Sequence, residues 1–415
     1  MPGKRSSASQ QGAPATNRPT QRPGDSATAA AAARSPVDAR CAQSQCILVL
    51  QGGGALGAYQ GGVYEVLTSI HREPDWVAGV SIGAINAALI VGNPPGQGLR
   101  RLREFWELVS SPMPTGLDTL LGGELRATFN DASALRGVLF GVPGFFIPRV
   151  PPAGWHPRGT PGAISHYDTE PLRRTLERMV DFDRINDGPI RLSVGAVNVR
   201  SGNFEYFDSA TRRLDARHVM ASGALPPGFP PVEIDGEYYW DGGLLSNTPL
   251  QYVLDQPAAR RRMIFQVDLF PAAGRLPATL GDVAAREKDI RFSSRTRLNT
   301  SHAVQRQRMA RAVRRLLDKL PPELHDDPDV RELARLHHSP GDMDIVHLIY
   351  RSKRYESQTK DFEFSRRSML EHWQAGVGDM SRTLGDPRWR NHDPQAEGVH
   401  VFDVPAAAAG HNEEA

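Results

Sequence analysis

The sequence predicts a layered α/β domain, because short apolar runs alternate with segments of helical periodicity from Gln45 to about Leu269. Two glycine-rich turns add to this pattern, at residues 52–57 and 79–83, each between a predicted strand and a predicted helix. The 415 residues suffice for one large domain with additions or for two domains. We therefore expect strands and helices that alternate along the chain and pack in layers.

The first elements follow from local patterns. Residues 47–50 are an apolar run and predict the first strand. After the first glycine turn, apolar residues recur at spacings of three and four and predict an amphipathic helix: Val63, Val66, Leu67 and Ile70. Residues 76–92, WVAGVSIGAINAALIVG, predict a short strand that ends at Val80 and a helix from Ile82. This helix is apolar on nearly all sides, so we expect it to be buried.

Three further strands are predicted downstream. Residues 190–199 (IRLSVGAVNV) and 204–207 (FEYF) are joined by the turn residues 201–203. Residues 262–270 (RMIFQVDLF) predict another buried strand.

The character of the sequence changes after about residue 272, where arginine-rich helical sequence begins. Residues 344–350 (DIVHLIY) predict a strand, and a long helix is predicted from about Glu356 to Leu384. One face of that helix is apolar, so we expect it to dock on the main domain: Phe362, Met369, Trp373, Val377, Met380 and Leu384.

These patterns divide the chain into four parts. Residues 1–43 are rich in Ser, Pro, Gln and Ala and predict a disordered tail, with a transit peptide as the alternative. Residues 44–271 form the main domain, and residues 272–390 a mostly helical extension packed on it. Residues 391–415 predict a flexible tail.

Charge and cysteine content restrict the class of protein. The net charge of +2 gives no general support for nucleic-acid binding. Cys41 and Cys46 form neither a disulfide framework nor a metal cluster, which fits a reducing compartment. No apolar run reaches the roughly 18–20 residues needed to span a bilayer. We therefore expect a cytoplasmic protein, with peripheral membrane association as an addition.

The first glycine turn has the spacing of a dinucleotide site, since Gly52, Gly54 and Gly57 satisfy G-x-G-x-x-G. A dinucleotide site also needs an acidic residue near the end of the second strand to bind the ribose. Residues 79–81 (GVS) stand there instead. The turn therefore favours a different partner for its backbone amides.

Residues 79–83 (GVSIG) form a G-x-S-x-G motif between a predicted strand and a predicted helix. A serine on such a sharp turn presents its hydroxyl outward, and the crowded turn requires small flanking residues. The following helix N-terminus favours developing negative charge. Ser81 is therefore a candidate nucleophile, with a packing serine as the alternative.

A serine nucleophile needs a base. Five histidines downstream are candidates, but none follows a clear strand: His302, His337, His338, His347 and His372. Asp241 follows the apolar run 238–240 and precedes two glycines, where a strand ends in a tight turn. Backbone amides can orient a carboxylate there and burial can raise its basicity, while a plain Asp-Gly turn is the alternative.

Three motifs now stand in order: the glycine cluster, G-x-S-x-G and the D-G-G of residues 241–243. This combination resembles the patatin-like phospholipases, a family of serine lipid acyl hydrolases. The segment 221–249 (ASGALPPGFPPVEIDGEYYWDGGLLSNTP) is similar to the family's approach to its aspartate, and the segment 167–186 (YDTEPLRRTLERMVDFDRIN) to its mid-domain region. The resemblance covers roughly Cys46 to Leu250.

The resemblance implies a three-layer α/β/α sandwich with a mostly parallel central sheet and a helical C-terminal extension. It implies hydrolysis of lipid acyl esters, as by a phospholipase A, through a dyad of Ser81 as nucleophile and Asp241 as base. The amides of Gly52, Gly53 and Gly54 would form the oxyanion hole. Further glycines would support these motifs: Gly57, Gly79, Gly83, Gly242 and Gly243. No cofactor and no metal are implied.

One position departs from the family. Arg or Lys often stands two residues after the third glycine, where this chain has Leu56. A preference for phosphate headgroups is therefore not implied, and neutral esters remain candidate substrates. Two other functions remain open: a soluble carboxylesterase or thioesterase on smaller acyl substrates, and a non-catalytic membrane-associated protein.

Two segments outside the motifs suggest contact with lipid. Residues 291–320 carry eight arginines and one lysine against a single acid, which suits an anionic membrane surface. The alternative is a solvated helix packed on the domain, and nucleic acid is disfavoured because no aromatics are interleaved. The irregular stretch 141–155, with Phe145, Phe146 and Trp155, predicts a lid or a part of the core. Nothing in the sequence indicates the oligomeric state.

Overall fold

A computed structural model describes residues 44–111, 123–258, 260–293, 296–336, 341–353, 355–393, 396 and 398–403. The predicted N-terminal tail, residues 1–43, lies outside this part of the chain, as do residues 404–415 of the predicted C-terminal tail.

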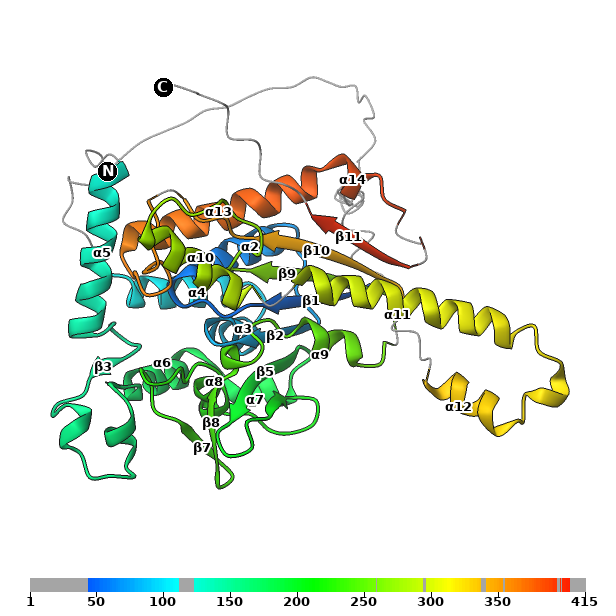
Figure 1. The fold of residues 1–415 in the computed structure, drawn as a ribbon, viewed down its shortest axis with the longest axis horizontal. Helices are drawn as coiled ribbons and strands as arrows, with labels where there is room; N and C mark the ends of the chain where they lie inside the picture. The colour runs from blue at the N-terminus through cyan, green and yellow to red at the C-terminus, as the bar shows by residue number, and fades with distance from the viewer. Residues whose placement is uncertain are drawn as a thin grey trace, which may run out of the picture. The chain divides into compact units, whose positions relative to one another are not determined.

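A nine-stranded sheet forms the centre of the fold (Figure 1). Its main path has the order β11-β10-β9-β1-β2-β5-β8-β7, and β6 also pairs with β5. The bounds are β1 Gln45–Leu50, β2 Trp76–Val80, β5 Arg191–Asn198, β6 Phe204–Asp208, β7 Val232–Ile234, β8 Glu237–Asp241, β9 Arg262–Asp268, β10 Met343–Ile349 and β11 Val399–Asp403. The strands from β11 to β5 run parallel, while β6, β7 and β8 pair antiparallel. The predicted mostly parallel sheet is confirmed. A separate small sheet pairs β3 (Ile147–Pro148) with β4 (Tyr167–Asp168).

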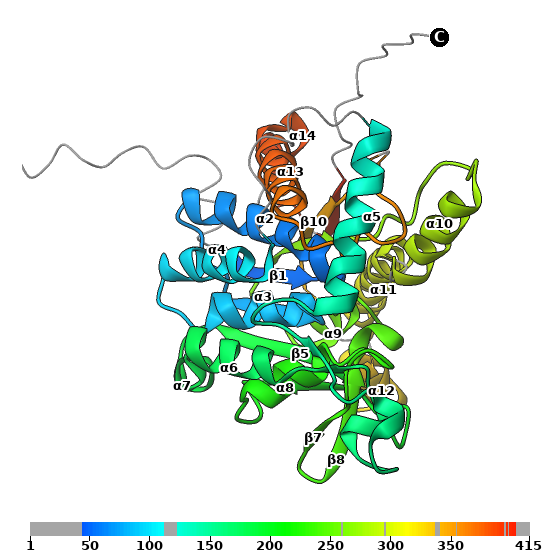
Figure 2. The same cartoon turned by 90° about the vertical axis from the view of Figure 1, so that its left-hand side faces the viewer.

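Helices cover both faces of the sheet (Figure 2). One layer contains α2 Ala58–Ser69, α3 Ile82–Val91, α4 Gln97–Val109, α6 Glu170–Met179, α7 Phe182–Asp187, α8 Ala216–Ser222 and α13 Arg366–Gly385. The opposite layer contains α9 Leu250–Asp255, α10 Leu280–Phe292 and α11 Thr296–Leu317. The remaining helices are α5 Gly123–Phe140, α12 Pro328–Leu336 and α14 Pro387–Arg390.

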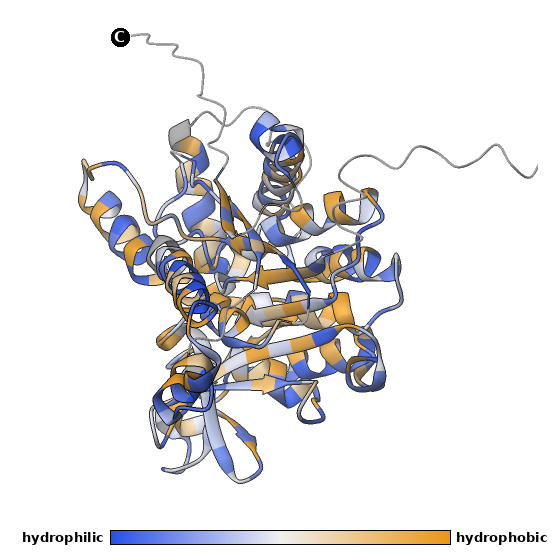
Figure 3. Ribbon diagram, turned by 90° about the vertical axis from the view of Figure 1, so that its right-hand side faces the viewer, coloured by the Kyte–Doolittle hydropathy of each residue, from blue (hydrophilic) through white to orange (hydrophobic). Residues whose placement is uncertain are grey.

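The apolar run of β1 is continuous because both of its faces are buried. Leu48 and Leu50 belong to the core on the α2 side, whereas Ile47 and Val49 pack in a second core with residues of α9. Successive side chains of a strand point to opposite faces, so a strand between two helical layers needs apolar residues at every position. Figure 3 shows the central strands mostly in the orange of apolar residues.

The long C-terminal helix begins later than the sequence predicts. Helix α13 starts at Arg366, with the Ser365 side chain as its N-cap, and not at Glu356. The preceding residues form a loop because Glu356 and Lys360 hydrogen-bond to side chains outside their own segment. The expected docking is confirmed, since Met369, Trp373 and Met380 are buried and α13 packs on α2.

The sheet continues beyond the predicted limit of the main domain. Strand β10, which the sequence predicts, pairs with β9, and β11 pairs with β10. β11 lies within residues 391–415, where the sequence predicts a tail. The boundary at residue 272 stays a prediction.

The ends of β2 and β8 lie beside neighbouring residues of β5. Parallel pairing places Val80, the last residue of β2, beside Gly195 of β5. Antiparallel pairing places Asp241, the last residue of β8, beside Ala196 of the same strand. Ser81 directly follows β2, and Asp241 is the last residue of β8. Both strands pair with β5, so these two residues lie close together although they are far apart in sequence.

Candidate active site

Ser81 sits on a strained turn between β2 and α3. Its backbone has φ 55° and ψ −125°, a left-handed conformation that is unfavourable for a residue with a side chain. A Cβ atom at Gly79 would overlap the carbonyl oxygen of Gly83, and one at Gly83 would overlap that of Leu50. The Ser81 amide donates to Ser222 Oγ at 3.0 Å, and Ser222 Oγ donates to the Gly195 carbonyl at 2.6 Å. The turn is thus fixed by packing and by a serine that sequence reasoning missed.

The Ser81 hydroxyl donates to Asp241 Oδ2 at 2.7 Å. The other carboxylate oxygen, Oδ1, accepts the Gly243 amide at 2.7 Å. Asp241 is only 3% exposed. Burial raises the pKa of Asp241 to about 7, and the hydrogen bonds from Gly243 and Ser81 oppose the rise. A carboxylate with this pKa can accept a proton near neutral pH.

The amides of the glycine turn have different partners. The Gly52 amide donates to the Asn247 carbonyl at 3.1 Å, and Asn247 Nδ2 donates back to the Gly52 carbonyl at 2.9 Å. The Ala55 amide donates to the Asp361 carbonyl at 2.7 Å. Within the described part of the chain, no hydrogen bond engages the amides of Gly53 and Gly54. Both glycines line the cavity that contains Ser81 and Asp241.

The remaining motif glycines lie at close approaches. A Cβ atom at Gly57 would lie 2.6 Å from Ile82 Cγ1, and one at Gly242 would lie 2.6 Å from the Gly195 carbonyl oxygen. At Gly243 it would lie 3.0 Å from Asn247 Oδ1. The absence of a side chain at these positions therefore permits the close approaches that the turns require.

The cavity around Ser81 is about 360 Å³ and is lined by many aromatic rings: Phe145, Phe146, Tyr167, Phe229, Phe270, Phe292, Phe362 and Phe364. Phe145 and Phe146 are buried in the core as well, whereas Trp155 is 82% exposed. The irregular stretch 141–155 thus contributes both to the core and to the cavity wall. A larger cavity, about 730 Å³, lies between residues 271–278, α10 and residues 349–353, away from Ser81.

No histidine lines the cavity around Ser81 in the described part of the chain. His302 is exposed. His347 lies 3.2 Å from Thr300 Oγ1, and His372 lies 2.7 Å from Glu356 Oε1. The other two candidates, His337 and His338, lie outside the described residues.

Sequence reasoning missed residues that hold or line the site. Asn247 belongs to the SNTP that follows the D-G-G motif, so its proximity to Asp241 in sequence was a usable signal. Asp361, Phe362 and Phe364 come from the loop before α13, and no local pattern links that loop to a catalytic turn.

Among the described residues, one group of side chains could hold a metal ion. Ligand atoms of Asp344, His392 and His400 lie within 4.8 Å of one another. The Asp344 carboxylate already forms an ion pair with Arg261 at 2.7 Å, which compensates its charge. The group lies near the starts of β10 and β11, and none of its members lines the cavity around Ser81.

A strained serine, a buried carboxylate and free backbone amides around an apolar cavity are the features expected of an acyl hydrolase. A sequence model described as patatin-like phospholipase matches residues 48–254, and one described as patatin phospholipase matches residues 290–396. The chain belongs to the patatin-like phospholipase family, and membership implies hydrolysis of lipid acyl groups.

The crystal structure of VipD from Legionella pneumophila is a further match. It is similar over 83% of this chain and 67% of its own, at 15% sequence identity and a TM-score of 0.34. No curated protein matches the chain. In the described part of the chain, every helix is too short or too polar to cross a bilayer.

Proposed function

We propose that the protein hydrolyses acyl esters of lipids with a two-residue catalytic unit, Ser81 and Asp241. The observation that carries the proposal is the 2.7 Å hydrogen bond from Ser81 Oγ to the buried Asp241 carboxylate. The carboxylate takes the part that histidine plays in a Ser-His-Asp triad.

In the first half of the reaction, Ser81 Oγ attacks the ester carbonyl carbon while its proton passes to Asp241 Oδ2. The negative charge that develops on the carbonyl oxygen is stabilised by the amides of Gly53 and Gly54. Gly52 then acts as a support, because its amide donates to Asn247. The tetrahedral intermediate collapses, the C–O bond of the leaving group breaks, and Asp241 gives its proton to the departing alcohol.

The second half of the reaction releases the fatty acid. Water attacks the acyl-serine carbonyl while Asp241 accepts its proton. Collapse of the second tetrahedral intermediate breaks the bond to Ser81 Oγ, which recovers its proton from Asp241. Besides the substrate and this water molecule, the proposed steps use side chains and backbone amides of the chain itself.

The wall of the cavity favours an apolar acyl group. Its aromatic lining buries hydrocarbon, and apolar burial contributes roughly 25 cal/mol per Å². The alternative of a soluble esterase or thioesterase uses the same residues on smaller acyl groups. A series of esters of increasing acyl length distinguishes the two, since a lipid hydrolase gains kcat/KM with length.

We propose that lipid contact occurs around the cavity mouth. Val138 and Leu225 line the cavity and are also 43% and 39% exposed. Leu139 and Phe140, next to Val138 on α5, are 56% and 74% exposed. An exposed apolar cluster continuous with a substrate cavity suits the surface of a bilayer.

The arginine-rich segment 291–320 is the other candidate for membrane contact. Most of its described part is α11, in which Ala303 and Ala310 are buried and two arginines pair with Asp255 and Asp342. Figure 1 shows α11 running away from α5 toward the opposite side of the view. We therefore give this helix a secondary part in membrane contact.

The first test is labelling by a fluorophosphonate, located by mass spectrometry, on wild-type protein and on Ser81→Ala and Asp241→Asn. We expect a label on Ser81 that is absent in Ser81→Ala and slowed by at least about 100-fold in Asp241→Asn, because nucleophile and base act as a unit. Labelling that does not depend on Asp241 means that another group is the base. No labelling of folded wild-type protein favours the non-catalytic alternative.

A further inference from the structure

We propose that the loop of residues 355–365 positions the glycine turn for catalysis, and that Lys288 and Lys360 are the positioning residues that hold this loop. The inference rests on the proposed function, because it concerns the amides of Gly53 and Gly54. It gives the segment after residue 272 a positioning role in turnover.

The loop touches the glycine turn backbone to backbone. The Asp361 carbonyl accepts the Ala55 amide at 2.7 Å, which fixes the peptide that follows Gly54. Gly54 has φ +54°, and a Cβ atom there would overlap the same carbonyl oxygen. Position 54 therefore accepts only glycine beside the loop, and the hydrogen bond from Ala55 holds the neighbouring peptide of the turn in one orientation while the loop stays in place.

Two lysines attach the loop to helix α10 and to Ser352, which follows β10. Lys288 Nζ lies 2.6 Å from the Asp361 carboxylate and donates to the Gln358 carbonyl at 2.9 Å. Lys360, only 4% exposed, forms an ion pair with Asp289 at 2.5 Å and donates to Ser352 Oγ at 2.6 Å. Lys360 and Asp361, the two residues that flank the peptide before the Asp361 carbonyl, thus each form an ion pair with a residue of α10.

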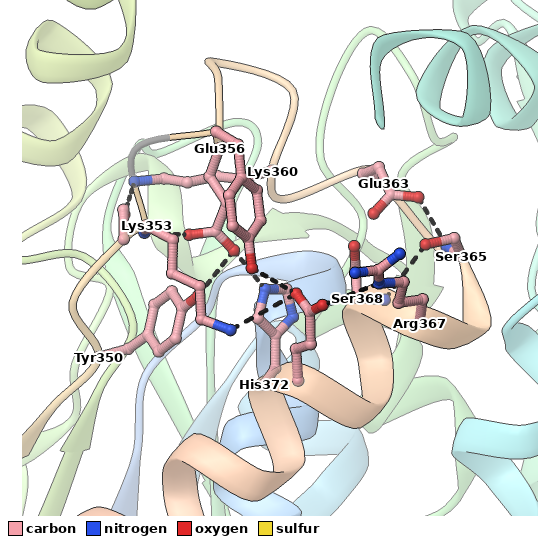
Figure 4. A network of polar contacts seen from close by, with 12 residues as sticks. Tyr350, Lys353, Glu356, Lys360, Glu363, Ser365, Arg367, Ser368 and His372 are labelled. Carbon is pink, nitrogen blue, oxygen red and sulfur yellow. Dashed lines mark hydrogen bonds and ion pairs between the residues drawn. The ribbon is translucent and has the colours of Figure 1, made fainter. Parts of the chain in front are cut away.

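The base of the loop is fixed by a second buried pair (Figure 4). Glu356 Oε1 lies 2.7 Å from His372 Nε2 and accepts the Tyr350 hydroxyl at 2.7 Å. Burial alone would raise the pKa of Glu356, but the contacts with His372 and Tyr350 outweigh it, so this pKa lies below its usual value. Glu356 therefore stays ionised and joins the start of the loop to α13.

The same loop closes one side of the cavity. Asp361, Phe362 and Phe364 line it together with Ser81, whereas neither Lys288 nor Lys360 does. The lysines therefore act through the residues they contact, which include those of the loop and, for Lys360, also the ring of Phe270, 5.6 Å from its Nζ atom. Donors of an oxyanion hole must be aimed at the transition state before reaction, so a loosened turn lowers the rate of the chemical step.

The test uses the full chain and p-nitrophenyl acetate, a soluble ester whose acyl group reaches little of the cavity. In Lys288→Met we expect kcat to fall about tenfold and KM to change by less than about twofold. This fall in kcat is smaller than the one caused by removing an oxyanion-hole donor, because both amides are still present. Lys288→Arg keeps the charge and should retain most of the activity. Lys360→Met should show the same split and a larger effect, because Lys360 is buried.

The matched control is Arg261→Met, which breaks another ion pair of the C-terminal segment, with Asp344, near the start of β10. This variant should lower the melting temperature and leave kcat unchanged. If folded Lys288→Met has wild-type kcat, or if Arg261→Met loses as much kcat, the inference is wrong. If Lys360→Met does not fold, Lys288→Met still decides. A wild-type protein that neither hydrolyses esters nor labels at Ser81 overturns the proposed function instead.

Discussion

At the scale of single residues, the environment of Asp241 matters most. An aspartate on a surface turn is a poor base because its ordinary pKa is about 4. Here burial raises the pKa to about 7, and two hydrogen bonds limit the rise. The same side chain thereby becomes able to exchange a proton with a serine hydroxyl close to neutral pH.

This pKa predicts the dependence of activity on pH. Below pH 7 Asp241 holds a proton and cannot accept that of Ser81, so kcat/KM should rise about tenfold per pH unit and level off above about pH 7. The measurement is kcat/KM for p-nitrophenyl acetate between about pH 5 and pH 9. Ionisation of a carboxyl group has almost no enthalpy, so the inflection should stay in place on warming. An inflection that moves strongly with temperature would identify a histidine instead.

At the scale of secondary structure, the contact between α13 and α2 shows how the C-terminal segment is held. Helix α13 approaches α2 so closely that a Cβ atom at Gly376 would overlap the Tyr59 carbonyl oxygen. Trp373 in turn covers Gly61 and Gly62 of α2. Glycines on both helices let the backbones approach, and the interface then buries the large ring.

Two glycines of α13 provide a matched comparison. Gly376→Ala should destabilise the protein by about 1–3 kcal/mol, because the backbone of α2 cannot move aside without opening the core. At Gly378 a Cβ atom meets only the flexible Arg382 side chain, at 3.4 Å. Gly378→Ala should therefore be neutral or stabilise by up to about 1 kcal/mol through helix propensity. Urea unfolding of both variants measures the difference, and equal midpoints would contradict the close packing.

At the scale of the whole molecule, the site combines parts from most of the described chain. Parallel strands β1 and β2 deliver the glycine turn and Ser81, antiparallel β8 delivers Asp241, and the loop after β10 supplies Asp361. The exposed apolar residues of α5 include Val138, which lines the cavity, so the fold places the proposed catalytic residues next to an exposed apolar surface.

A pair of charge changes tests which surface meets the lipid. Phe140→Asp at the cavity mouth should reduce hydrolysis of phospholipid vesicles at least about tenfold, since it puts a charge where apolar contact is proposed. Hydrolysis of p-nitrophenyl acetate should stay the same. Arg315→Glu, on the exposed side of α11, should reduce vesicle hydrolysis less. A larger effect of Arg315→Glu would make the arginine-rich segment the main membrane contact.

The sequence by itself determined the features that depend on local rules. A strand, a tight turn of small residues and a helix fix the backbone around Ser81, and this pattern is readable in GVSIG. Because β1 and β9 are buried on both faces, their sequences are apolar runs, and the sequence therefore predicts both strands. The D-G-G turn indicated Asp241 as a candidate base, and the resemblance to patatin-like phospholipases joined the motifs into one function.

Only the tertiary structure decided how distant parts meet. The hydrogen bond between Ser81 and Asp241 depends on strand pairing across β5, and the raised pKa of Asp241 depends on burial. The hydrogen bonds from the Gly52 amide to Asn247 and from the Ala55 amide to Asp361 cannot be predicted from the local sequence around the glycine turn. Residues 356–365 had helical periodicity, yet they form a loop in which Glu356 and Lys360 bond to residues outside this segment. Long-range pairing and burial, which a local pattern does not contain, settled these features.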